Sequence, residues 1–297
     1  MDLPVINHPD YVAKINDDNK FPIKKFGALA KHLIDCRIVK NFHIPTECSI
    51  ETLKSSHSLE YIYQIKNKTL DLKLQKKIGF PINDSVVKRS FVATGGTVLA
   101  SKLALDSKLA CNTAGGSHHA TFNYGAGYCV FNDVAVAANY LKNKGLAKKI
   151  LILDLDVHQG NGNSEIFQND KDVLTFSMHC ASNYPAKKSN SDIDVELKDG
   201  MEDREYLNIL HKNLKDLNKF NFDFVFYVAG VDVHFDDRLG KLKLSDEGID
   251  KRDKIVIENY FNKNIPLCGV LGGGYNKSFN KLVELHSLLH KNCADLI

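Results

Sequence analysis

The chain has 297 residues, 43% of them hydrophobic, and this composition can bury a sizeable core. No linker or low-complexity segment interrupts it, so we expect one domain over residues 1–297. Its 39 basic and 36 acidic residues are scattered and leave a net charge of +3, which does not favour direct nucleic-acid binding. Neither a secretory signal nor a membrane-spanning stretch is visible. The seven cysteines form no Cys-x-x-Cys pair, which indicates free thiols and predicts a cytoplasmic location.

Strand-like and helix-like segments alternate along the second half of the chain. Short runs rich in β-branched and aromatic residues predict strands buried on both faces, and segments with a helical spacing of apolar residues separate them. This alternation predicts an α/β fold with a central parallel sheet and helices on both of its faces. In chain order we expect a helix over 131–144, strands over 149–154 and 173–177, a helix over 204–220, a strand over 222–229, a helix over 245–263, a strand over 265–271 and a helix over 278–291.

Polar residues follow each of the four predicted strands. They are residues 154–161, residues 177–179, Asp232 and residues 272–275. In folds of this kind ligands bind beyond the carboxyl ends of the strands, where these residues would lie. The four strand ends therefore predict one shared site at a single edge of the sheet.

Two carboxylates and one imidazole near these strand ends could hold a metal ion. Asp156 and His158 are two residues apart and can face one ion, and Asp232 is the best-placed third ligand. Three protein ligands leave a position open for water, as a catalytic zinc site requires. Oxygen ligands also suit Fe²⁺, Mn²⁺ or Co²⁺, so zinc is a preference. The alternative is a structural role, in which Asp156 caps a helix and His158 is a polar loop residue.

Tandem histidines and a glycine-rich turn complete this set of polar groups. His118 and His119 could be surface residues of a loop, but beside a metal-bound water one imidazole can accept a proton while the other stabilises charge. Asp154 could orient one of them. Tyr275 follows three glycines and could donate a hydrogen bond to a carbonyl oxygen that gains negative charge, although such turns are often structural. Cys129 precedes an apolar segment and is expected to be a buried, unreactive thiol.

These residues resemble the zinc-dependent histone deacetylase family, whose α/β fold is shared with the arginases. The likeness extends through nearly the whole chain and depends on the order and combination of a few motifs. The resemblance implies a single-domain arginase/deacetylase-like fold and a metal-dependent amidohydrolase. The strongest motifs are Gly-Ser-His118-His119, Asp154-x-Asp156-x-His158, Gly-Val-Asp232 and Gly-Gly-Gly-Tyr275.

The resemblance also implies a catalytic role for each matching residue. The three candidate ligands would bind zinc, and His119 would act first as general base and then as general acid. His118 would be its electrostatic partner, hydrogen-bonded to Asp154. Tyr275 would stabilise the oxyanion that forms on the carbonyl group.

Two further sets of residues match binding sites of the family. The acyl-lysine tunnel would be lined by Gly127, Tyr128, Tyr184, Leu239 and Gly273. A structural potassium ion beneath the zinc would be held by backbone oxygens around Asp154, Asp156, His158, Ser177 and Met178.

Two segments, 158–162 and 237–240, are most similar to the class IV branch, whose best-known member prefers long-chain acyl-lysine. Asn161 stands where class I enzymes have an aspartate that would contact His119. A neutral amide does less than a carboxylate to raise the pKa of that imidazole, which favours the unprotonated base. Leu239 stands where polyamine-selective relatives have a glutamate, so the resemblance argues against a polyamine substrate.

The predicted reaction is hydrolysis of an ε-N-acyl-lysine amide in a protein or peptide, with an acetyl or a longer acyl group. Two enzymes of the same fold are alternatives: an acetylpolyamine amidohydrolase, and a two-metal ureohydrolase in which His234 and Asp236 would supply more ligands. A third alternative is a protein that only binds acyl-lysine, although every catalytic position holds a competent residue. The sequence leaves the acyl length, the native metal and the oligomeric state open.

Overall fold

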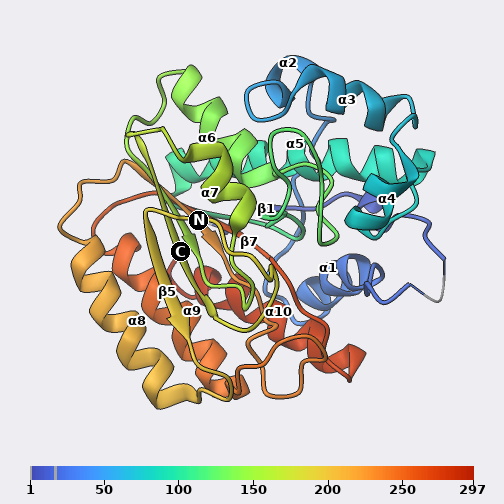
Figure 1. The fold of residues 1–297 in the computed structure, drawn as a ribbon. Helices are drawn as coiled ribbons and strands as arrows, with labels where there is room; N and C mark the ends of the chain where they lie inside the picture. The colour runs from blue at the N-terminus through green and yellow to red at the C-terminus, as the bar shows by residue number, and fades with distance from the viewer. Residues whose placement is uncertain (1, 17–18) are drawn as a thin grey trace.

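The structure is a computed structural model that describes residues 2–16 and 19–297, and it places a central sheet between layers of helices (Figure 1). Within the described residues the sheet has seven strands in the order β1-β2-β7-β6-β3-β4-β5, and all neighbouring strands are parallel. The strands are β1 (Val5–Ile6), β2 (Leu109–Asn112), β3 (Ile150–Asp154), β4 (Val173–Cys180), β5 (Ile193–Leu197), β6 (Phe224–Val228) and β7 (Leu267–Val270).

Most helices begin at a polar residue whose side chain accepts a hydrogen bond from the first turn, which is the usual N-terminal cap. Ser245 accepts from the amide of Gly248 at the start of α9, and Asn132 accepts from the amide of Ala135 at the start of α6. A short 3-10 helix, η1, covers Pro9–Tyr11. The α-helices are α1 (Lys25–Asp35), α2 (Ile50–Leu53), α3 (Leu59–Lys66), α4 (Leu72–Ile78), α5 (Asp84–Ser107), α6 (Asp133–Asn143), α7 (Asn161–Phe167), α8 (Asp203–Leu217), α9 (Asp246–Phe261) and α10 (Phe279–Ala294).

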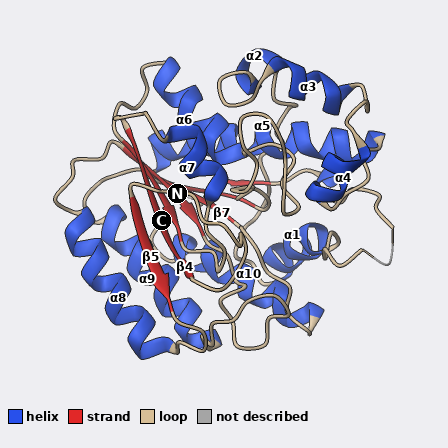
Figure 2. Ribbon diagram, in the orientation of Figure 1, coloured by secondary structure: helices blue, strands red, loops and turns tan. Residues whose placement is uncertain are grey.

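Helices cover both faces of the sheet, as predicted (Figure 2). Side chains alternate along a strand, so successive residues of β3 pack on opposite faces. Ile150 and Ile152 belong to one core with alanines of α5 and α6. Leu151 and Leu153 belong to a second core with apolar residues of α8, α9 and α10. In Figure 1, α5 and α6 lie above the sheet and α8 to α10 lie below it.

The carboxyl ends of the four central strands are aligned. Asp154 at the end of β3 lies opposite Ser177 of β4 on one side and Val228 of β6 on the other. Val228 in turn lies opposite Val270 of β7. The loops that follow these strands therefore leave the sheet at one edge, which confirms the predicted meeting of the four strand ends.

The four predicted strands correspond to β3, β4, β6 and β7, and the four predicted helices to α6, α8, α9 and α10. The sequence prediction missed the outer strands, all helices before residue 131 and the short helix α7. β5 alternates half-buried and exposed residues because it lies at the sheet edge, so it lacks the continuous apolar run of a central strand. In the part of the chain that the structure describes, no helix combines the length and the apolar character needed to span a bilayer.

Candidate metal centre and active site

The segment after β3 sends polar and apolar side chains in opposite directions. Leu155 and Val157 are fully buried in the core, so Asp156 and His158 face the other way. The turn is held by its own carboxylates. The amide of Asp156 donates to Asp154 Oδ1 at 3.2 Å, and the amide of His158 donates to Asp156 Oδ1 at 2.9 Å.

Asp156 does not cap a helix, which was the role considered above as an alternative to metal binding. The next helix, α7, begins at Asn161 after Gly160, and no side chain caps it. Both oxygens of Asp156 are used inside the site instead. Oδ1 accepts from the amide of His158, and Oδ2 accepts from the amide of Gly273 at 2.5 Å.

Asp156, His158 and Asp232 are close enough to share one metal ion. Their ligand atoms lie within 4.8 Å of one another, and all three residues are buried. His158 Nδ1 is 3.0 Å from Asp156 Oδ1 and 3.2 Å from Asp232 Oδ2. Burial and the charge of Asp156 raise the pKa of Asp232, and within the described residues Asp232 Oδ2 accepts no hydrogen bond. A divalent cation would satisfy this oxygen and offset the repulsion between the carboxylates.

Two glycines leave room for these carboxylates. A Cβ atom at Gly273 would lie 2.0 Å from Asp232 Oδ2, and one at Gly230 would lie 2.4 Å from Asp156 Oδ2. Any larger residue would push the oxygens out of place, so both positions require the close approach that glycine allows. One imidazole nitrogen and two carboxylates form a donor set that suits zinc, and also Fe²⁺, Mn²⁺ or Co²⁺.

The residues proposed for a second metal do not join this cluster. His234 Nε2 lies 2.8 Å from Asp246 Oδ1, and Asp236 accepts from the ammonium group of Lys277 at 2.9 Å. Across residues 2–16 and 19–297, Asp156, His158 and Asp232 are the one group of acidic, histidine or cysteine residues with metal-binding spacing. This arrangement gives no support to the two-metal ureohydrolase.

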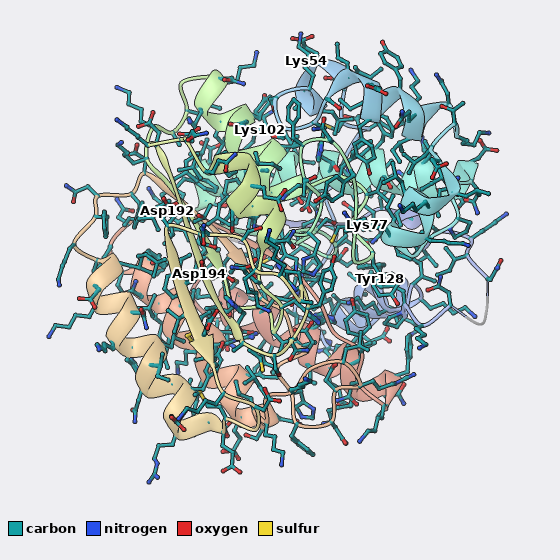
Figure 3. The ribbon with its side chains drawn as sticks, in the orientation of Figure 1. Lys54, Lys77, Lys102, Tyr128, Asp192 and Asp194 are labelled. Carbon is teal, nitrogen blue, oxygen red and sulfur yellow. The ribbon has the colours of Figure 1, made fainter. Side chains whose placement is uncertain are left out.

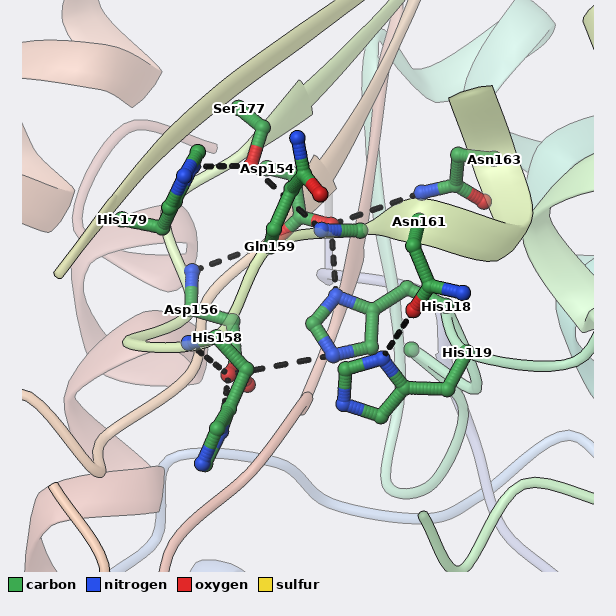
Figure 4. A network of polar contacts seen from close by, with 12 residues as sticks. His118, His119, Asp154, Asp156, His158, Gln159, Asn161, Asn163, Ser177 and His179 are labelled. Carbon is green, nitrogen blue, oxygen red and sulfur yellow. Dashed lines mark hydrogen bonds and ion pairs between the residues drawn. The ribbon is translucent and has the colours of Figure 1, made fainter. Parts of the chain in front are cut away.

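The tandem histidines lie beside the cluster and have different environments (Figure 4). His118 Nδ1 is 2.6 Å from Asp154 Oδ2. Burial lowers the pKa of His118, but the carboxylates of Asp154 and Asp156 outweigh it and raise this pKa to about 9. His119 Nδ1 is 2.8 Å from Asn161 Oδ1, the oxygen of a neutral amide.

The pKa of His119 is held well below its usual value by burial and by the neighbouring imidazoles of His118 and His158. The two rings are in contact, with centroids 4.1 Å apart. At neutral pH the pair therefore combines a protonated imidazole, His118, with a neutral one, His119. These are the states needed for charge stabilisation and for accepting a proton.

A pocket of about 520 Å³ opens over the metal cluster and the two histidines. Leu239 and Tyr184 are partly exposed, at 38% and 42%, and line its outer part, whereas the ligands are buried. Tyr184 packs edge-on against His119, with ring centroids 4.8 Å apart. The walls include every residue predicted for the tunnel, namely Gly127, Tyr128, Tyr184, Leu239 and Gly273.

Tyr128 is held against the end of α4 at one wall of the pocket (Figure 3). Its amide donates to the backbone oxygen of Ile78 at 2.7 Å. The centroid of its ring lies 5.9 Å from the ring centroid of Tyr275 and 5.1 Å from that of Phe21. The prediction for Cys129 is confirmed: it is buried, and burial raises the pKa of its thiol to about 12.

Tyr275 lines the pocket and is 9% exposed. Its backbone amide donates to Asp237 Oδ2 at 2.6 Å, which anchors the turn after the three glycines. Burial and the charges of Asp232 and Asp156 raise the pKa of its phenol well above the usual value. The hydroxyl group is therefore protonated, and able to donate a hydrogen bond, throughout the neutral range.

The predicted potassium ligands come from two adjacent strands and from the loop that follows the first of them. Asp154 and Ser177 lie opposite each other in β3 and β4, and Met178 follows in β4. The amide of Gly160 donates to Ser177 Oγ at 3.4 Å. The structure thus places the two backbone segments side by side at the carboxyl end of β3.

Several pocket residues come from the N-terminal part of the chain and were not predicted. Phe21, Phe26, Ile78 and Arg89 line the pocket, and Phe21 packs against both Tyr128 and Tyr275. Nothing in the local sequence around these four residues marks them as pocket walls.

A buried lysine behind the site was also missed. Lys25 is 1% exposed, and its ammonium nitrogen lies 3.1 Å from His286 Nε2 and 3.5 Å from the backbone oxygen of Gly272. Burial lowers its pKa to about 8, against the opposing charges of Asp232 and Asp156. The buried ammonium group of Lys25 thus interacts electrostatically with both carboxylates.

Fold and site together define an α/β enzyme with one candidate metal centre at the carboxyl ends of parallel strands. A family model described as the histone deacetylase domain matches residues 20–288, and the chain belongs to this family. An uncharacterized protein of Picosynechococcus sp. is 44% identical over 299 residues and covers all of both chains. Histone deacetylase 2 of Arabidopsis thaliana is 31% identical over 283 residues, which cover 89% of this chain and 71% of the relative.

Solved structures have the same fold. A histone deacetylase homologue crystallised with SAHA superposes with a TM-score of 0.84 at 24% identity, covering 99% of this chain and 84% of the other. The predicted family and the single-domain deacetylase fold are therefore confirmed. Membership of this family makes the protein a hydrolase of the deacetylase type.

Proposed function

We propose that the protein hydrolyses ε-N-acyl-lysine amides, with His119 as the proton-transferring residue. The observation that carries this proposal is the pair of adjacent histidines, His118 against a carboxylate and His119 against a neutral amide, next to the three candidate metal ligands. A pocket with aromatic walls leads to these groups, and the acyl-lysine side chain is a long apolar stem with one amide.

The three clustered residues would hold zinc or a related divalent ion. Such an ion polarises a carbonyl group and lowers the pKa of a water molecule when bound. The chain's own residues account for the proton transfers. Nδ1 of His119 is engaged by Asn161, so Nε2 is the nitrogen left to accept a proton from the attacking water.

The water oxygen bonds to the carbonyl carbon as its proton passes to His119. The same imidazole then returns the proton to the lysine nitrogen as the C–N bond breaks. The second proton of the attacking water, left on the carboxylic acid, then passes to the amine, so the products are a carboxylate and a lysine ammonium group, and atoms and charges balance. His118, held positive by Asp154, stabilises the negative charge that develops nearby.

Tyr275 donates its hydroxyl hydrogen to the carbonyl oxygen as that oxygen becomes negative. Its raised pKa keeps the proton on the phenol, and its packing against Phe21 and Tyr128 fixes the ring. Tyr128 and Tyr184 would contact the lysine stem, with Gly127, Leu239 and Gly273 completing the tunnel.

The acyl group would lie deeper in the pocket, against Phe21 and Phe26. These aromatic walls support acyl groups from acetyl upwards, and the match of segments 158–162 and 237–240 to the class IV branch supports longer chains. A potassium ion held by the paired ends of β3 and β4 is part of the same proposal. Action in the cytoplasm agrees with seven free cysteines.

A series of fluorogenic lysine peptides, from acetyl to myristoyl, tests the proposal. We expect release of the free lysine amine by the zinc-loaded protein, loss of turnover after chelation, and recovery when the metal is returned. Metal content per chain is measured in parallel, and we expect one transition-metal ion. Turnover of N-acetylputrescine faster than of every acyl-lysine peptide would instead identify a polyamine amidohydrolase, and a lack of turnover of every substrate would favour a binding protein.

A further inference from the structure

A glutamate outside the catalytic pocket is connected to the proposed general base through one amide side chain. His119 Nδ1 is 2.8 Å from Asn161 Oδ1, and the amide nitrogen of Asn161 is 3.5 Å from Glu165 Oε1. Asn161 and Glu165 are four residues apart on α7, so they share one face of the helix. The three side chains form a line from the pocket to the protein surface.

The chemistry of the outer group decides the direction of every hydrogen bond in this line. An ionised carboxylate only accepts, so Glu165 requires the NH₂ group of Asn161 to face it. The oxygen of Asn161 must then face His119, and it can only accept. The Nδ1 atom of His119 must therefore carry the hydrogen, which leaves Nε2 with a free electron pair on the pocket side.

From this geometry we infer that Glu165 is a positioning residue that fixes the tautomer of His119. Without the carboxylate, the amide of Asn161 can turn over and present its NH₂ group to Nδ1. His119 would then carry its hydrogen on Nε2 and could not accept a proton from water. The inference extends the proposed acyl-lysine hydrolysis and depends on it for its functional meaning.

Glu165 is itself held in place from the other side. The hydroxyl group of Ser189 donates to Glu165 Oε1 at 3.1 Å. Ser189 is fixed in turn by Gln159, whose side-chain oxygen accepts from the Ser189 amide and whose nitrogen donates to the Ser189 backbone oxygen, both at 2.8 Å. The carboxylate therefore has a defined place, although it is only partly buried.

The ring of His119 cannot adjust to a reversed amide by rotating. It is 4% exposed, and a Cβ atom at Gly127 would lie 2.5 Å from its Cδ2 atom, so the backbone lies directly against the ring. His118 and Tyr184 contact the same ring at centroid distances of 4.1 and 4.8 Å. Since the ring is fixed, the orientation of the Asn161 amide alone selects which nitrogen carries the hydrogen.

Nitrogen-15 NMR of the zinc-loaded protein, with labelled histidine, tests this inference directly. The His119 signals are assigned by comparison with a His119→Gln variant. We expect the parent protein to show hydrogen on Nδ1 of His119 and a bare Nε2. We expect Glu165→Ala to show a mixture of both tautomers. Glu165→Gln should restore the parent pattern, because its oxygen can still accept from Asn161.

Kinetics on an acyl-lysine peptide provide the second readout. Glu165→Ala should lower kcat by about two- to tenfold, the factor that corresponds to one net hydrogen bond, with KM changed less than twofold. Glu165→Gln should recover most of this loss. Gln168→Ala is the matched control, because Gln168 lines the same polar surface cavity of about 810 Å³ as Glu165. It should keep both the tautomer and kcat.

Several outcomes would overturn the inference. These are a parent protein with hydrogen on Nε2, a Glu165→Ala variant with an unchanged tautomer, and a variant that loses kcat without any change in the His119 signals. A tautomer that responds to Glu165 in a protein without acyl-lysine turnover would leave the inference standing. In that case the proposed function is the part that fails.

Discussion

Replacing Tyr275 by phenylalanine separates chemistry from folding and binding at this site. The change removes one hydroxyl group from a residue that is 9% exposed and keeps its aromatic ring. The centroid of that ring lies 5.9 Å from the ring centroid of Tyr128 and 6.1 Å from that of Phe21. Asp237 accepts its hydrogen bond from the backbone amide of residue 275, so the substitution keeps this hydrogen bond. We therefore expect an unchanged melting temperature and unchanged metal content.

The expected kinetic effect is large. The phenol donates most strongly when the carbonyl oxygen becomes negative, and loss of one such donor lowers kcat by about 10²–10³, with KM nearly constant. Burial keeps the pKa of Tyr275 well above the neutral range, so the loss should be the same from pH 6 to pH 9. Release of free lysine amine from an acyl-lysine peptide gives kcat and KM, and metal analysis accompanies each preparation.

Tyr63→Phe is the matched control, because it removes the same hydroxyl group from a side chain on α3 that is 46% exposed and lies outside the pocket. It should behave as the parent protein. A Tyr275→Phe variant with the parent kcat would refute the reasoning, since another group would then have to stabilise the oxyanion. A variant that loses metal or unfolds would show that the phenol contributes to structure.

Three further substitutions test other parts of the site. Asp232→Ala should abolish both metal binding and turnover, because it removes one of the three candidate ligands; a fully metallated, active variant would exclude Asp232 as a ligand. Asn161→Asp should move the acidic limb of the pH profile of kcat/KM to higher pH. A carboxylate 2.8 Å from Nδ1 favours the imidazolium and raises the pKa of His119, so the free base is lost at a higher pH than in the parent protein. An unmoved limb would contradict this. Leu239→Glu should shift selectivity towards acetylpolyamines by about 0.2–1 kcal/mol, which is the range of an exposed ion pair. The measurement is the ratio of kcat/KM for N8-acetylspermidine to kcat/KM for an acetyl-lysine peptide. An unchanged ratio would place Leu239 away from the bound cation.

The sequence predicted those parts of the molecule whose signal is local. Continuous apolar runs marked β3, β4, β6 and β7, because strands buried on both faces admit few polar residues. The polar residues directly after these runs marked the site, because parallel strands end at one edge of the sheet. The residues that the structure clusters, Asp156, His158 and Asp232, were therefore predictable, with the family resemblance assigning a role to each.

The pocket walls depended on contacts that are distant in the sequence. Phe26 reaches the pocket from α1, which packs on α10, and Phe21 reaches it from the segment just before α1. An apolar residue gives no sign in the sequence of which cavity it will line. The same holds for Lys25, whose neighbour His286 is 261 residues away. Such pairings are decided by how the layers stack.

The sequence by itself determined the family, the four central strands and the identity of the polar groups. Only the tertiary structure decided their protonation. His118 and His119 are adjacent and chemically identical in the chain. The carboxylates of Asp154 and Asp156 nevertheless outweigh burial and raise the pKa of His118, whereas burial and two neighbouring imidazoles lower the pKa of His119. The charge of a buried group depends on the atoms that replace its water, and those atoms come from distant segments of the chain.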